Sequence, residues 1–225
     1  ILLHASEKTQ LPVIKRAIDI ARIFYDKENL DNTIKNHILA STLLGIITSS
    51  DSSPSKSDKL VAIMAHFGTA EINIDSPLET GGSLKQAISI DFGKMKNEEA
   101  AIKFLTQFVD QELIGRVSTD KEVIYDLAEF AQAIEFATLY EGSVSSQRIQ
   151  EYTATLITRL QTIKDGIQGK ILSKTQYNSL DEYVAHFVGN WQIIDVDISS
   201  LDDASAEVVT KVLAKMLLDY VKHKE

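Results

Sequence analysis

The chain has no cysteine among its 225 residues. This absence excludes disulfide bonds, thiol nucleophiles, redox-active thiols and zinc sites with cysteine ligands. It also favours a reducing compartment, because disulfides persist mainly in oxidising ones. We therefore expect the chain to be cytoplasmic.

Long apolar runs are also missing. No stretch of about 20 uncharged apolar residues occurs, so the sequence predicts no transmembrane helix. The chain begins at Ile1 rather than at methionine. We interpret it as a processed or trimmed product, and an export signal or a membrane anchor ahead of Ile1 stays open as an alternative.

Motifs that carry catalysis or cofactor binding are missing as well. The sequence has no G-x-S-x-G elbow, no phosphate-binding loop, no dinucleotide fingerprint and no H-E-x-x-H pair. Its densest acidic cluster does not have the ligand spacing of a calcium-binding loop; it consists of Asp195, Asp197, Asp202 and Asp203. The sequence thus predicts no metal site and no cofactor, and it favours a non-enzymatic protein over an enzyme.

Positive charge is scarce. The chain carries 23 Lys and Arg against 32 Asp and Glu, for a net charge of −9. An acidic chain of this kind repels the phosphates of nucleic acid. We therefore expect a protein partner, basic or partly disordered, and no nucleic acid.

The stretch from Asp126 to Glu141 is the most informative one that is present. Polar residues recur at every third position, with apolar residues between them, and the composition favours a helix. A step of three falls about 60° short of a full turn, so the polar line drifts around the helix and leaves no continuous polar face. We therefore predict a central helix here, with the other helices packed around it.

Carboxylates of this helix have no cation nearby in the sequence, because no Lys or Arg occurs between Lys121 and Arg148. A buried carboxylate without a partner is costly. We therefore expect Glu129 and Glu135 to be partly exposed, or paired with a cation of another helix such as Arg16 or Arg22.

Elsewhere, apolar stripes at helical spacing predict a mainly α protein: an irregular bundle of about seven or eight helices in a single domain, residues 1–225. The polar run Ser49–Asp58 interrupts the pattern, and we predict a flexible loop there. The helix after it is expected to begin near Lys56.

A minor β element is predicted near residues 70–92 and 191–198. Ile72 and Ile74 alternate with polar residues, and so do Ile88, Ile90 and Phe92. These two stretches favour a hairpin with a long connection, and a short helix beginning at Ser83 is the alternative. Ile194, Val196 and Ile198 form a third candidate strand.

Two functional hypotheses follow. The first is an adaptor or scaffold subunit that presents helix faces to a protein partner. An aromatic set at roughly helical spacing would be its partner-binding surface: Tyr177, Tyr183, Phe187 and Trp191. The second is an enzyme or small-ligand carrier with an acidic site inside the bundle, for which Glu129, Glu135 and His186 are the candidate catalytic residues.

Overall fold

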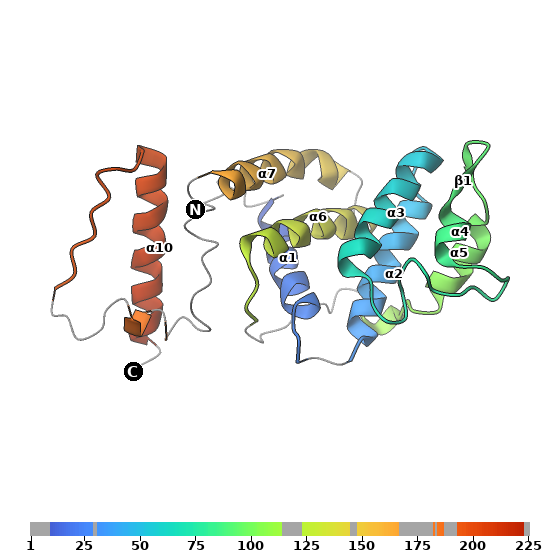
Figure 1. Cartoon of the computed structure of the whole chain (residues 1–225), viewed down its shortest axis with the longest axis horizontal. Helices are drawn as coiled ribbons and strands as arrows, with labels where there is room; N and C mark the ends of the chain where they lie inside the picture. The colour runs from blue at the N-terminus through green and yellow to red at the C-terminus, as the bar shows by residue number, and fades with distance from the viewer. Residues whose placement is uncertain are drawn as a thin grey trace. The chain divides into compact units, whose positions relative to one another are not determined.

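The computed structural model describes residues 10–28, 31–113, 123–144, 148–166, 182, 184–186 and 193–222. These residues form helices and one small two-stranded antiparallel sheet (Figure 1). The mainly α prediction is therefore confirmed. None of the described helices combines the length and the apolar character that a membrane span requires.

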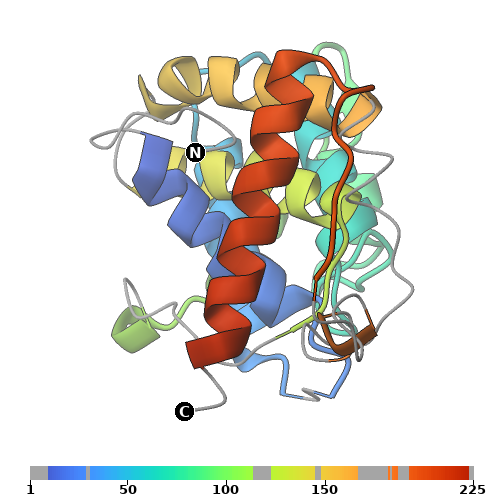
Figure 2. The same ribbon diagram turned by 90° about the vertical axis from the view of Figure 1, so that its left-hand side faces the viewer.

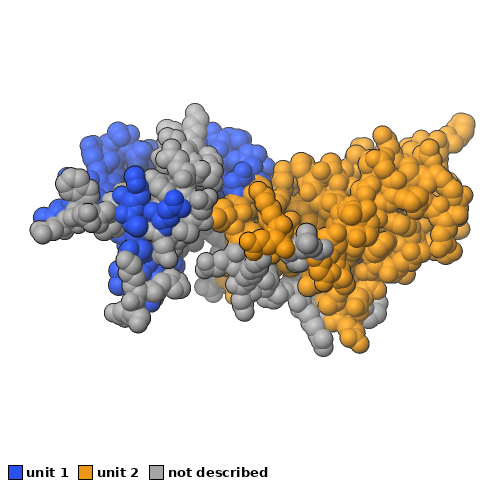
Figure 3. All heavy atoms as spheres, turned by 60° about the horizontal axis from the view of Figure 1, so that its bottom comes forward, with its two compact units in different colours: residues 1–4, 126–128, 158–225 blue, residues 5–125, 129–157 orange. Residues whose placement is uncertain are grey.

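The chain divides into two compact units, coloured separately in Figure 3. Unit 1 contains residues 1–4, 126–128 and 158–225, and unit 2 contains residues 5–125 and 129–157. The prediction of a single domain stays a prediction.

Most of the described helices lie wholly in unit 2. They are α1 (Gln10–Phe24), α2 (Thr33–Ile47), α3 (Ser53–Phe67), α4 (Leu84–Ile88), α5 (Glu98–Thr106) and the 3₁₀ turn η1 (Gln111–Leu113). Two further helices have residues in both units: α6 (Leu127–Val144) and α7 (Arg148–Asp165). In unit 1, α10 (Asp203–Lys222) begins after Asp202, whose carboxylate accepts hydrogen bonds from the backbone N–H and the hydroxyl of Ser205.

The predicted central helix is present as α6. Its second half is buried along much of its length. The ring of Phe136 stacks on Phe67 of α3, with centroids 4.4 Å apart, and meets Phe24 of α1 edge-on at 5.5 Å. Contact among these three rings, of which Phe67 and Phe136 are buried, supplies a large apolar area to this part of the core. The helix α6 thus packs against α1 and α3, and its central place among all the helices stays a prediction.

A second helix, α2, is interior too. Residues 36–40 are all buried, and α2 packs against α1, α3 and α5. Because neighbours cover several of its faces, polar residues such as His37 and Asn36 are drawn inside with it.

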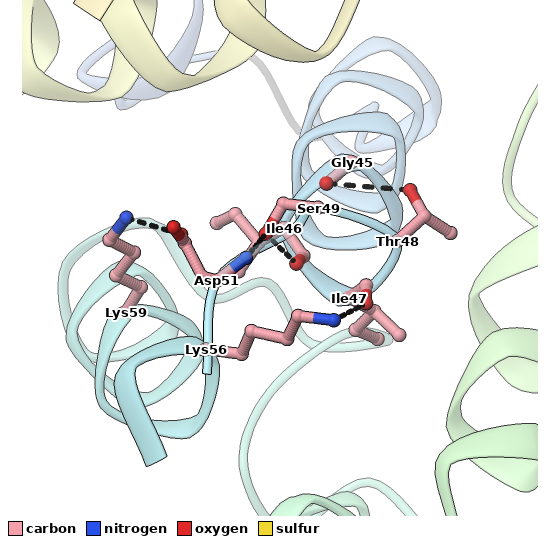
Figure 4. Close-up of polar contacts among 8 residues, drawn as sticks. All are labelled: Gly45, Ile46, Ile47, Thr48, Ser49, Asp51, Lys56 and Lys59. Carbon is pink, nitrogen blue, oxygen red and sulfur yellow. Dashed lines mark hydrogen bonds and ion pairs between the residues drawn. The ribbon is translucent and has the colours of Figure 1, made fainter. Parts of the chain in front are cut away.

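Hydrogen bonds and an ion pair hold the corner between α2 and α3 (Figure 4). The Lys56 ammonium donates to the carbonyl of Ile47 at 2.6 Å, and Lys59 pairs with Asp51 at 2.7 Å. A cation at the C-terminal end of a helix stabilises the carbonyls there that lack intrahelical partners. Lys56 therefore acts across the corner, on the helix that precedes its own.

This corner is shorter than the loop that we predicted for Ser49–Asp58. The helix α3 begins at Ser53, with Pro54 in its first turn, where the missing proline N–H costs nothing. The sequence interpretation placed that start near Lys56 because it treated the serine-rich run as one loop. Residues 53–58 are helical instead.

The β element differs from the hairpin that we preferred. Residues 72–74 form no strand, and the short helix from Ser83, our alternative, is present as α4. The Ser83 hydroxyl accepts from the Gln86 N–H, and the Gln86 side chain accepts from the Ser83 N–H, so a capping box fixes the helix start. The sheet lies directly after α4, as β1 (Ile90–Asp91) and β2 (Lys94–Met95).

The third strand candidate is also wrong as far as it can be followed. Residues 193–198 are described and adopt no strand, although Ile194, Val196 and Ile198 alternate with polar residues. Alternation gives a strand only where another strand supplies backbone partners.

Candidate functional site

The exposure of Glu129 and Glu135 agrees with the prediction from the charge pattern. Glu129 is half-buried and Glu135 is exposed, which confirms that they are partly exposed. They lie six positions apart on α6, and at about 100° per residue their side chains leave different sides of the helix. The structure therefore does not bring them together into one acidic site.

A pairing of the expected kind, with a cation of another helix, occurs at Glu141 near the end of α6. Arg16 of α1 contacts Glu141 through its Nε at 2.8 Å, and both side chains are largely buried, with exposed fractions of 20% and 17%. The Arg16 guanidinium also lies 5.6 Å from the centroid of the Tyr140 ring. Burial raises the pKa of the Tyr140 hydroxyl, and the positive charge of Arg16 partly opposes this.

The remaining predicted site residues give no second cluster. His186 is exposed and belongs to unit 1. The four candidate partner-binding aromatics, Tyr177, Tyr183, Phe187 and Trp191, lie outside the described residues. Within the described ranges, no three His, Asp or Glu side chains gather closely enough to hold a metal ion.

The feature that stands out is the hairpin between α4 and α5. Ile90 pairs with Met95, and Asp91 pairs with Lys94, so Phe92 and Gly93 form a two-residue turn. Their φ angles are +44° and +79°, both in the left-handed region. This is the geometry of a type I′ turn, which normally has Asn-Gly or Gly-Gly at these positions.

Phe92 is unfavourable at this position for two independent reasons. A non-glycine residue in the left-handed region costs roughly 1–2 kcal/mol. The Phe92 side chain is also fully exposed, so it forgoes the ~1.5–3 kcal/mol that burying an aromatic ring of this kind would contribute. Since the fold gains nothing from this residue at the tip, the combination of strain and exposure points to a function.

The base of the hairpin is firmly held. Below the strands, the Lys96 N–H donates to the Ser89 carbonyl and the Asn97 N–H to the Ala87 carbonyl, each at 3.0 Å. The Met95 side chain is buried, and α3 packs against both strands. The ring of Phe92 is thus presented on a rigid support, which reduces the entropy that binding would cost.

Charge around the tip differs from that of the whole chain. Asp91, Lys94 and Lys96 are exposed on the hairpin, and Lys85 is exposed on α4. The hairpin itself thus carries one acid and two bases, and Glu98 and Glu99 follow it at the start of α5. A partner surface that faces the hairpin would therefore gain from negative charge.

A small pocket lies on the same unit, between α5 and the loop of residues 76–83. Its volume is about 120 Å³, and it is lined by Pro77, Glu79, Thr80, Ala100, Lys103, Phe104 and Gln107. Glu79 and Lys103 pair across its rim at 2.6 Å, and this contact lowers the pKa of the Glu79 carboxyl. The Phe104 ring is braced edge-on by Phe108 at 5.3 Å.

The sequence interpretation missed Phe92 because it counted this residue as the last member of an alternating strand. That alternation would have placed Phe92 on one face with Ile88 and Ile90. The glycine directly after it was the available signal, since a glycine inside an alternating pattern indicates a turn or a bulge.

No protein-family model matches the chain, and no curated protein matches it. The function is therefore argued from the chemistry of the hairpin and the pocket alone.

Proposed function

We propose that this chain is a non-enzymatic protein-interaction module, an adaptor or scaffold subunit, that contacts a protein partner through the Phe92 hairpin. The observation that carries the proposal is the fully exposed aromatic ring on a strained turn with a rigid base. A few buried residues, aromatic ones prominent among them, commonly supply most of the binding energy of a protein interface. A hairpin with one exposed ring at its turn is suited to a partner that has a pocket for that ring.

A membrane surface fits the hairpin less well. One phenyl ring buries little apolar area, and even a whole myristoyl chain gives only marginal membrane binding. The net charge of −9 also opposes approach to an anionic membrane. A protein pocket, in contrast, can enclose a single ring completely.

The enzyme or ligand-carrier hypothesis gains no support from the acids that suggested it. Glu129 and Glu135 are partly exposed, and they leave different sides of α6. A buried acidic site would need them together and away from water. The absence of cysteine fits an adaptor that works in a reducing compartment such as the cytoplasm.

Site-specific photo-crosslinking tests the proposal. A photoreactive phenylalanine analogue at position 92 is expected to give one discrete crosslinked protein, identified by mass spectrometry, in cells that express the chain. The matched control carries the same analogue at Ile124, another exposed apolar residue of unit 2. The proposal fails if position 92 yields no crosslink, or if both positions yield the same diffuse set.

A further inference from the structure

The pocket beside α5 has the size of one aromatic ring. Its volume is about 120 Å³, and an apolar cavity of about 150 Å³ is known to bind benzene. Pro77, Ala100 and Phe104 provide apolar walls, and Phe104 offers a ring for edge or offset stacking. A planar apolar group is therefore the best-matched occupant.

The rim of the pocket and the sides of the hairpin carry matching charges. Glu79 and Lys103 supply one acid and one base at the rim, and both are largely exposed. Asp91 and Lys94 supply one acid and one base directly behind Phe92, as a cross-strand pair. A ring seated in the pocket can thus be flanked by two pairs of opposite charge.

We propose that the pocket of one copy of this chain receives Phe92 of a second copy, with Lys94 of the second copy beside Glu79 of the first, and Asp91 of the second copy beside Lys103 of the first. This inference rests on the proposed function and names the partner that the hairpin contacts. An acidic chain would otherwise repel its own copies, and two contacts between opposite charges reduce that repulsion where the hairpin meets the pocket.

The positions of the two features determine the kind of assembly. The hairpin projects at one end of the α4–α5 pair, and the loop of residues 76–83 lies toward the other end (Figures 1 and 2). A contact between two different surfaces continues from copy to copy unless two copies exchange hairpins about a two-fold axis or a larger ring closes. One hairpin in one pocket also makes a small interface, so the association is weak and depends on protein concentration.

Sedimentation equilibrium over a wide range of protein concentrations tests this inference. The average mass of the wild-type chain is expected to rise with concentration above the monomer mass, and a closed dimer or a larger assembly both support the inference. Phe92→Ser is expected to hold the mass at the monomer value, whereas Ile124→Ser, which removes exposed apolar surface elsewhere, should behave as the wild type. A wild-type chain that stays monomeric at every concentration, or a Phe92→Ser chain that still associates, overturns the inference.

Charge reversal identifies the surface that Phe92 occupies. Lys94→Glu and Glu79→Lys are each expected to weaken association several-fold at low salt, because each places like charges together. The double variant restores opposite charges and is expected to recover most of the wild-type association. A double variant no better than the worse single variant excludes this pairing.

The two proposals fail separately. If the crosslink from position 92 joins a different protein and the wild-type chain stays monomeric, the interaction function stands and self-association falls. If position 92 gives no crosslink in cells and the wild-type chain stays monomeric, both fall.

Discussion

The imidazole of His37 on α2 accepts a hydrogen bond at its Nδ1 from the backbone N–H of Asp110, at 3.0 Å. Because Nδ1 is the acceptor, the neutral ring carries its proton on Nε2. That Nε2 is buried and has no hydrogen-bond partner. Only the neutral imidazole can join α2 to the segment after α5 in this way. Protonation would place a hydrogen on Nδ1, so that two donors would face each other.

This bond predicts a loss of stability in mild acid. Burial lowers the pKa of His37 below its usual 6.5, although the nearby Asp110 carboxylate acts in the opposite direction. Between the lowered pKa and 6.5 the unfolded chain binds more protons than the folded one, so the free energy of unfolding falls as pH decreases below about 6.5. Urea denaturation between about pH 7 and pH 5 should show this fall, above the range where carboxylates titrate.

The control for this prediction is His37→Asn, which keeps a hydrogen-bond acceptor without a titrating ring. Its stability is expected to be lower than that of the wild type at pH 7 and nearly independent of pH over the same range. An equal decline in both proteins would assign the effect to other groups.

The strained turn predicts that Phe92→Asn stabilises the fold. Asparagine tolerates the left-handed region far better than phenylalanine and is favoured at this position of a type I′ turn. The free energy of unfolding is expected to rise by up to about 1 kcal/mol. The neighbouring change Gly93→Ala should lower the free energy of unfolding. A Cβ at this position meets no atom within 4 Å, so the loss comes from placing alanine at a φ of +79°. Chemical denaturation of both variants measures these changes, and a destabilised Phe92→Asn would show that the ring supports the fold.

Some of this architecture follows from local sequence and some does not. The helix at Asp126–Glu141 could be predicted because its composition and its three-residue polar step are properties of one continuous segment. The pairing of Glu141 with Arg16 was expected in kind, since a carboxylate without local cations has few alternatives in a folded chain.

Features set by tertiary contacts could not be predicted in this way. The burial of His37 depends on how many helices surround α2, which the stripe on one segment does not reveal. The hairpin was misplaced because two-residue strands are too short to give a periodic signal, and because the capping box at Ser83 carried more information than the alternation. The pocket beside α5 is lined by a loop and by a helix some 20 residues later in the chain, so no single sequence motif predicts it.

The contact between Arg16 and Glu141 is expected to stabilise unit 2 more than the exposed pair at the pocket rim. Arg16→Ala removes a largely buried ion pair and the contact with the Tyr140 ring, for a loss of about 1–2 kcal/mol. Lys103→Ala removes only the pair with Glu79, whose two side chains are largely exposed and screened by water, so its cost should be much smaller. Thermal denaturation of the two variants compares them directly, and equal losses would contradict the role given to burial.

The aromatic contact of Phe136 with Phe67 and Phe24 predicts the largest loss of stability among these variants. The Phe136 side chain is almost completely buried, and its ring contacts two rings from two other helices. Phe136→Ala removes this apolar area and leaves a cavity that neighbouring helices close only in part, at a cost of about 3–5 kcal/mol.

Phe136→Leu keeps most of the side-chain volume and should lose clearly less stability. Urea denaturation of both variants, with the exposed change Ile124→Ser as the reference for a neutral apolar loss, measures the difference. A Phe136→Ala protein as stable as Ile124→Ser would mean that α6 is not packed into the core of unit 2.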